Sequence, residues 1–223
     1  MTDSLIPLES LGGELSVQQE AELLAEVASG GAYLPYMQLF TTKSGPVTEG
    51  KIPGGHYGVV RDGNITDIGK EVNLILIAVR ARAYEKTDGG QITVVFDKND
   101  AEYIRIQDLQ ASGVQGCMAG PEFLVWIPSE KTFATYFCGS KTLKREARKL
   151  GRFLGGHAVS FRVHLIDNGK HKWHGPLVSA CSVSLPSLPD SEELTEEVQK
   201  FKNPPKQAQG ESASPDATDQ VSR

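Results

Sequence analysis

Residues 72–84 read VNLILIAVRARAY, a run of apolar and β-branched residues that is typical of a β-strand. Gly89-Gly90 precedes a second strand-like stretch, residues 91–97, so we expect these two segments to form a hairpin. A strand of this length would span roughly 43 Å at about 3.3 Å per residue, and such strands normally bend or coil. Long bent strands favour a small β-barrel.

Two further hairpins are expected downstream. Residues 123–127 and 132–138 are apolar and are joined by a turn-forming segment. Apolar and polar residues alternate over 159–165, and Asn168-Gly169 is a strong hairpin signal before a strand from 173 to 183. The sequence therefore predicts a mainly β fold, an OB-like small β-barrel.

Composition divides the chain into three parts. Residues 1–34 carry six acidic and no basic residues, with a short helix that begins near Ser16, so they form an acidic arm. Residues 35–186 are the expected barrel domain. Residues 187–223 are rich in Glu, Ser, Pro and Gln and predict a disordered acidic tail, apart from a residual helix near 192–201.

Basic residues are concentrated within the barrel domain. The whole chain has a net charge of −5, yet residues 131–172 hold ten basic and two acidic side chains. Much of this charge falls on one helix, which Ser140 caps and which has Leu143, Ala147 and Leu150 along its apolar side. Such a block favours a polyanionic partner, and the alternative is an ordinary solvated basic face.

The Asn168-Gly169 turn also predicts a register, in which His164 opposes Trp173 and Arg162 opposes Gly175. Arg162, His164, His171 and Trp173 would then share one face, which could stack and bind nucleic-acid bases. The alternative interpretation places Trp173 in the core.

The middle hairpin is apolar on both faces. One face must be core, and the other, which includes Trp126 and Phe133, is either covered by a helix or available for base stacking. We take thirteen residues as candidate nucleic-acid ligands: Lys131, Lys141, Lys144, Arg145, Arg148, Lys149, Arg152, Arg162, His164, Lys172, Trp173, Trp126 and Phe133.

No catalytic signature is apparent, and we expect no enzyme activity, metal or other cofactor. His171 and His174 lack the repeated spacing of zinc ligands, and no cysteine has the local sequence of a nucleophile. Three cysteines without paired spacing favour a reducing compartment. The absence of a long apolar run predicts no membrane span, and the N-terminus does not read as a secretory signal, so we expect a cytoplasmic protein.

Several short segments resemble phage-encoded proteins: residues 116–125, Phe133-Ala134-Thr135, Gly139-Ser140-Lys141 and Arg145-Glu146-Ala147. Together with a basic barrel and an acidic tail, the chain is similar to phage single-stranded DNA-binding proteins of the OB-fold class. This resemblance implies DNA replication or recombination in the host cytoplasm, with partner proteins recruited by the tail. It assigns no binding residue, and the tail tip, which ends in Arg223, is less acidic than those of such proteins.

The expected function is therefore non-catalytic binding of single-stranded DNA or RNA, with DNA favoured. Lysines and arginines would neutralise phosphates, and aromatic side chains would stack on bases. The alternative is a phage structural or adaptor protein that docks on another protein through its acidic N-terminal helix. The oligomeric state does not follow from the sequence.

Overall fold

The computed structural model describes residues 34–42, 44–87, 92–167, 169, 172–181 and 188–204. The chain divides into two units between Tyr33 and Leu34, and all described residues belong to the second. The acidic helix expected within residues 1–34 and the end of the expected tail, residues 205–223, lie outside this description.

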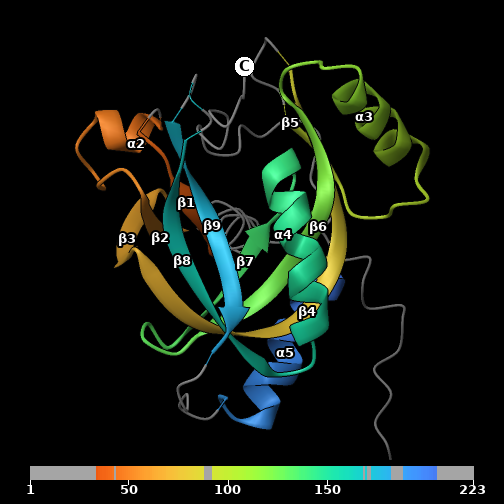
Figure 1. The fold of residues 1–223 in the computed structure, drawn as a ribbon. Coiled ribbons are helices and arrows are strands. Elements are labelled where there is room, and N and C mark those ends of the chain that lie inside the picture. Colours follow the sequence, from red (N-terminus) through yellow and green to blue (C-terminus); the bar gives the residue numbers. More distant parts are fainter. Residues whose placement is uncertain are drawn as a thin grey trace, which may run out of the picture. The chain divides into compact units, whose positions relative to one another are not determined.

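The described residues form one sheet of nine strands, which confirms a mainly β fold (Figure 1). The order across the sheet is β3-β2-β1-β7-β6-β4-β8-β9, and β5 pairs with the far part of β4. Every pair is antiparallel except β1 with β7. The strands are β1 (Tyr36–Phe40), β2 (His56–Arg61), β3 (Asn64–Gly69), β4 (Glu71–Lys86), β5 (Ile92–Val95), β6 (Cys117–Ile127), β7 (Thr132–Phe137), β8 (His157–Asp167) and β9 (Lys172–Ala180).

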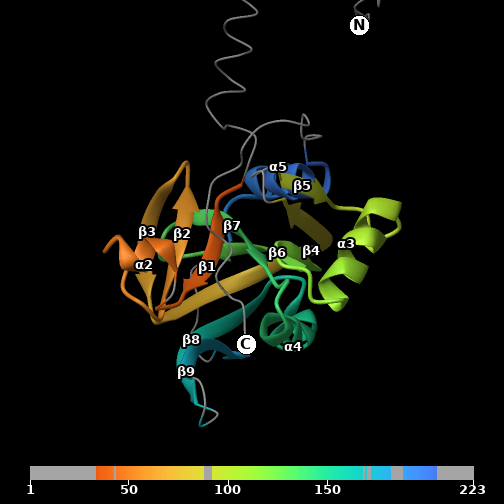
Figure 2. The same cartoon turned by 90° about the horizontal axis from the view of Figure 1, so that it is seen from above.

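The helices lie on both sides of this sheet. They are α2 (Gly45–Thr48), α3 (Ala101–Ala111), α4 (Lys141–Leu150), which continues into a 3₁₀ turn (Gly151–Phe153), and α5 (Ser191–Lys202). Figure 2 shows the sheet curled into a half-barrel, with α4 and α5 on opposite sides of it. We call the side that faces α4 the inner face and the side that faces α5 the outer face.

The expected long strand is β4, and its bend has a local cause. Its pairing with β6 shifts register between Leu76 and Ala78, where an extra residue is accommodated. β4 pairs with β8 through residues 71–76 and with β5 through residues 83–86, so the expected hairpin with the following strand is confirmed. The two downstream hairpins, β6–β7 and β8–β9, are confirmed as well.

The main core fills the inner face. Alternate β6 residues, Phe123, Val125 and Ile127, pack there with residues from seven other elements, among them Ala147 and Leu150 of α4. The intervening β6 residues, Leu124 and Trp126, point to the outer face. There they form a smaller cluster with α5. This cluster is separate from the main core, so the two faces of the sheet pack independently.

The curl brings the segment before β2 close to β9, which is distant from it in the sheet order. Gly55 precedes β2, and a Cβ atom built on it would lie 2.8 Å from Nε2 of His174 in β9. Gly55 has a φ of +81°, a conformation that side-chain-bearing residues rarely adopt. Beside it, Nδ1 of His56 lies 2.9 Å from the Asp67 carboxylate. The segment that precedes β2 therefore lies against β9 across the half-barrel.

The residual helix expected near 192–201 is confirmed as α5, which spans Ser191–Lys202. It packs on the sheet with Phe201 fully buried, so the folded unit extends beyond residue 186, where the barrel domain was expected to end. The register of the β8–β9 hairpin is also shifted by two residues: Asp167 pairs with Lys172, and His164 pairs with Gly175.

Candidate nucleic-acid interface

Helix α4 carries most of the candidate cations, and its sequence explains its position. The Ser140 side chain accepts a hydrogen bond from the Leu143 amide, as expected for its N-cap. Ala147 and Leu150 are buried in the main core, so the helix is fixed on the inner face. The remaining surface of the helix is left to charged side chains.

Four cations of α4 and its 3₁₀ extension are exposed: Arg145, Arg148, Lys149 and Arg152. Glu146, the acid between them, has a buried side chain whose carboxylate lies 2.9 Å from Lys149 Nζ and 3.5 Å from Arg145 Nε. Within the described residues, no acidic side chain pairs with Arg148 or Arg152. These two arginines are therefore the cations of α4 that are available to an anionic partner.

Lys144 has a different role from the exposed cations. Its Nζ donates a 2.7 Å hydrogen bond to Gln110 Oε1, which also accepts from the Ala119 amide. Gln110 Nε2 donates to the Gly139 carbonyl, so this group ties α3 to α4 and to the start of β6. Partial burial lowers the pKa of Lys144. Lys141 begins the helix, but its side chain lies outside the described part of the structure.

In the β8–β9 hairpin, three residues of the predicted face stay together despite the shift in register, and the fourth, His171, lies outside the described residues. A shift of two residues leaves Arg162, His164 and Trp173 on one side, because side chains alternate with a period of two. Trp173 now pairs with Ile166 and is half-buried. This is the outer face of the hairpin, since Phe161 and Val178 occupy the core on the other face.

The cations of this hairpin already have partners. Arg162 Nε lies 2.8 Å from Glu71 Oε1, and Lys172 Nζ lies 3.0 Å from Asp167 Oδ2. All four side chains are substantially exposed, so water screens both ion pairs and a phosphate could compete for either cation.

The middle hairpin places its candidates elsewhere. Trp126 is 7% exposed and Phe133 is 5% exposed, and α5 covers both on the outer face. Neither ring can stack on a base while α5 is in place. Lys131 is exposed in the β6–β7 turn, which Figure 1 shows at the opposite end of the sheet from the end of β8 and the start of β9. The structure therefore brings together the α4 cations but not all thirteen candidates.

A second arginine cluster on the outer face was not anticipated. Glu122, whose side chain is 1% exposed, accepts from Arg80 Nε and Arg82 Nη1, each at 2.7 Å. The Arg80 guanidinium lies over the rings of Phe96 and Phe201, and that of Arg82 lies over Phe137. The alternation of arginine with alanine in residues 80–83 was the available signal, because two arginines on one face of a strand require an acid partner when they are buried.

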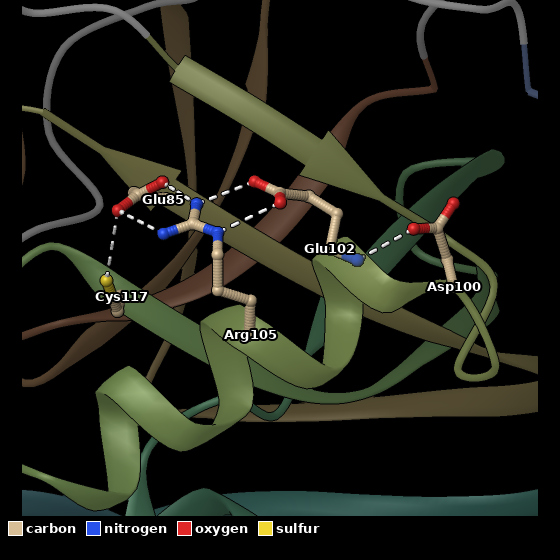
Figure 3. Close-up of polar contacts among 5 residues, drawn as sticks. All are labelled: Glu85, Asp100, Glu102, Arg105 and Cys117. Atoms are coloured by element: carbon tan, nitrogen blue, oxygen red, sulfur yellow. Dashed lines mark hydrogen bonds and ion pairs between the residues drawn. The ribbon is translucent and has the colours of Figure 1, made fainter.

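Helix α3 is held by a third charged group (Figure 3). Arg105 bridges Glu102 in the same helix and Glu85 of β4, and Asp100 caps the helix by accepting from the Glu102 amide. Cys117 Sγ lies 3.8 Å from Glu85 Oε1. Burial and the nearby carboxylate raise the pKa of Cys117, so its thiol stays protonated at neutral pH and is a poor nucleophile. The group anchors a helix to a strand.

The buried thiol of Cys138 behaves in the same way. Burial raises its pKa, and the carboxylates of Glu122 and Glu146 add to the effect.

In the part of the chain that the structure describes, no three His, Cys, Asp or Glu side chains are arranged to hold a metal ion. None of the described helices is long and apolar enough to cross a bilayer. No protein-family profile, curated protein or solved structure matches the chain.

Proposed function

We propose that this protein binds single-stranded nucleic acid, with DNA as the favoured form, and catalyses no reaction. The observation that carries the proposal is the exposed cationic side of α4, where Arg148 and Arg152 have no acidic partner among the described residues. They are four positions apart, Arg148 on α4 and Arg152 on the 3₁₀ turn that continues it, so they can contact phosphates on the same strand.

The position of α4 gives such a strand a path. The helix packs on β9, which is the last strand in the sheet order. A strand held by α4 can therefore pass around the β9 edge to the outer face of the hairpin, where Arg162, His164 and Trp173 lie. Phosphate contacts on α4 would supply most of the affinity, and stacking on Trp173 would favour single strands over duplexes.

The same proposal includes an OB-like architecture, a phage-type role, a cellular location and partners for the tail. The half-barrel supports an OB-like architecture in its curl, although it has nine strands where an OB barrel has five. A role in phage-type replication or recombination, a cytoplasmic location and partners for the acidic tail rest on the sequence resemblance and on the cysteine pattern.

The test is the salt dependence of binding to an oligothymidylate. The double variant Arg148→Gln and Arg152→Gln should reduce the magnitude of the slope of log affinity against log salt by about 1.4, because roughly 0.7 counterion is released per phosphate contact on a single strand. Lys98→Gln is the control, since Lys98 is exposed in the loop before α3 and has no acidic partner among the described residues. It should leave the slope unchanged.

Two results would contradict the proposal. An unchanged slope in the double variant would remove α4 from the interface. Failure of the unmodified chain to bind the oligonucleotide at low salt would favour the adaptor function, in which the acidic N-terminal segment docks on a protein.

A further inference from the structure

The outer face of the sheet combines aromatic rings with arginines. In the β6–β7 pairing Trp126 opposes Phe133 and Glu122 opposes Phe137, so all four side chains share this face. β4 adds Arg80, opposite Glu122, and Arg82, opposite Gly120. We call Trp126, Phe133, Phe137, Arg80 and Arg82 the covered face.

Helix α5 packs against three of these residues, Trp126, Phe133 and Arg80. Phe201 is fully buried against Trp126 and Phe133, and Leu194 and Val198 pack beside it at helical spacing. The Phe201 carbonyl, in the last turn of α5, accepts a hydrogen bond from Arg80 Nη1. These contacts belong to a cluster of five buried residues that is separate from the main core. Loss of α5 would therefore leave the inner face intact.

Polar groups on and beside the covered face are incompletely bonded in this arrangement. The indole Nε1 of Trp126, Nε of Arg82 and the hydroxyl of Tyr84 are all buried and have no hydrogen-bond partner among the described residues. Tyr84 lies in the same cluster, since its ring contacts Phe137 and the Arg82 guanidinium. Buried donors without partners are destabilising, so the covered state of this face is not optimised for hydrogen bonding.

We propose that the covered face is a second, cryptic site for single-stranded nucleic acid and that α5 is displaced when a strand binds there. This inference rests on the proposed function. Aromatic rings stack on bases regardless of sequence, and arginines on aromatic rings supply both cation–π contacts and phosphate ligands. A phosphate oxygen would replace the Phe201 carbonyl at Arg80, and it is the stronger acceptor because it is charged.

The length of α5 makes this exchange feasible. A helix of this length is marginally stable in water when it lacks tertiary contacts, so α5 should unfold once Phe201 leaves the sheet. Displacement therefore predicts a loss of amide protection that is confined to residues 191–202.

Hydrogen exchange of the unmodified full chain tests this directly. With saturating oligothymidylate, the amides of α5 should exchange faster than in the free protein, whereas those of α3, which is bound to β4 through Arg105, should not change. Equal or greater protection of α5 in the complex would overturn the inference. The proposed function would still stand if the complex forms with the salt slope expected for α4.

A charge-neutral variant provides the second test. Val198→Ser with Phe201→Ser weakens the docking of α5 without altering the electrostatics of the chain, and Thr195→Ser on the exposed side of α5 is the matched control. In the double variant the covered face is exposed before the oligonucleotide binds. Its affinity for oligothymidylate should therefore rise about tenfold, because less binding energy is needed to open the site. With Trp173→Phe in the background, the remaining fluorescence of Trp126 should be quenched on binding. Unchanged affinity and unquenched Trp126 fluorescence would overturn the inference.

Discussion

Glu122 is the acid on which two arginines depend. Its carboxylate is nearly inaccessible to solvent and accepts from both Arg80 and Arg82. Glu122→Gln would leave two partly buried guanidinium groups without a counter-charge, and we expect it to lower the free energy of unfolding by about 3–5 kcal/mol. Glu71→Gln, which breaks the exposed pair with Arg162, should cost at most about 1 kcal/mol. Urea denaturation of both variants measures the difference, and equal losses would contradict this account of Glu122.

His174 should make stability depend on pH. Burial lowers its pKa in the folded protein, and the positive charges of Lys70 and of His56, which pairs with Asp67, lower it further. The unfolded chain, with a histidine pKa of about 6.5, then binds more protons than the folded one. Stability should therefore fall as the pH drops below about 6.5 and level off below the folded pKa.

His174→Gln should flatten this dependence, whereas His157→Gln, at an exposed position of β8, should not. Urea midpoints at pH 7.5 and 5.5 are the measurement. If the pH dependence of stability persists unchanged in His174→Gln, groups other than His174 cause it.

Among the elements, the β8–β9 hairpin offers the clearest test of stacking. Trp173 is half-buried on the outer face, so Trp173→Ala should cost less stability than the about 3–5 kcal/mol of a core tryptophan. If bases stack on the indole, the same variant should lose about 1–3 kcal/mol of binding to a single strand. Leu177→Ala, on the same face of β9 but exposed, is the control. Thermal melts and oligonucleotide titrations of both variants are the measurement. If Trp173→Ala is strongly destabilised yet binds as tightly as the unmodified protein, bases do not stack on this indole.

The sequence predicted elements that local patterns determine. The three hairpins and α4 follow from alternation, turn residues and the Ser140 cap. The predicted β8–β9 register is wrong because it rests on a two-residue turn at Asn168-Gly169. In the structure Asp167 pairs with Lys172, so four residues and not two separate the paired ends.

Elements fixed by tertiary contacts were harder to predict. The composition around α5 is acidic, and only Leu194, Val198 and Phe201, at helical spacing, indicated a packing face. Its partner surface on β6 and β7 is distant in sequence, so neither the docking of α5 nor the burial of Trp126 followed from local patterns. Helix α3 had a usable signal in the Asp100 cap and in the spacing of Tyr103 and Ile106.

At the scale of the whole molecule, the contact between Gly55, just before β2, and His174 of β9 joins two segments that lie far apart in the strand order of the sheet. Gly55→Ala would introduce both an unfavourable positive φ and a clash with the His174 ring, whereas Gly63→Ala, with a φ of +76° and no neighbour within 4 Å, introduces only the first. We expect Gly63→Ala to cost roughly 1–2 kcal/mol and Gly55→Ala about 1–3 kcal/mol more. Chemical denaturation gives both values. Equal losses would mean that the close approach of Gly55 to His174 contributes nothing to stability.

The pairing of β4 also has a consequence for synthesis on the ribosome. Residues 71–76 pair with residues 157–162, roughly 90 positions later in the chain. At about 5–20 residues per second, the edge of the longest strand waits roughly 5–20 s for its partner after it is made. An apolar strand with an open edge is prone to aggregate during such an interval. The nascent chain is therefore a natural client for chaperones that bind extended apolar segments, and its yield should depend on them more than its final stability does.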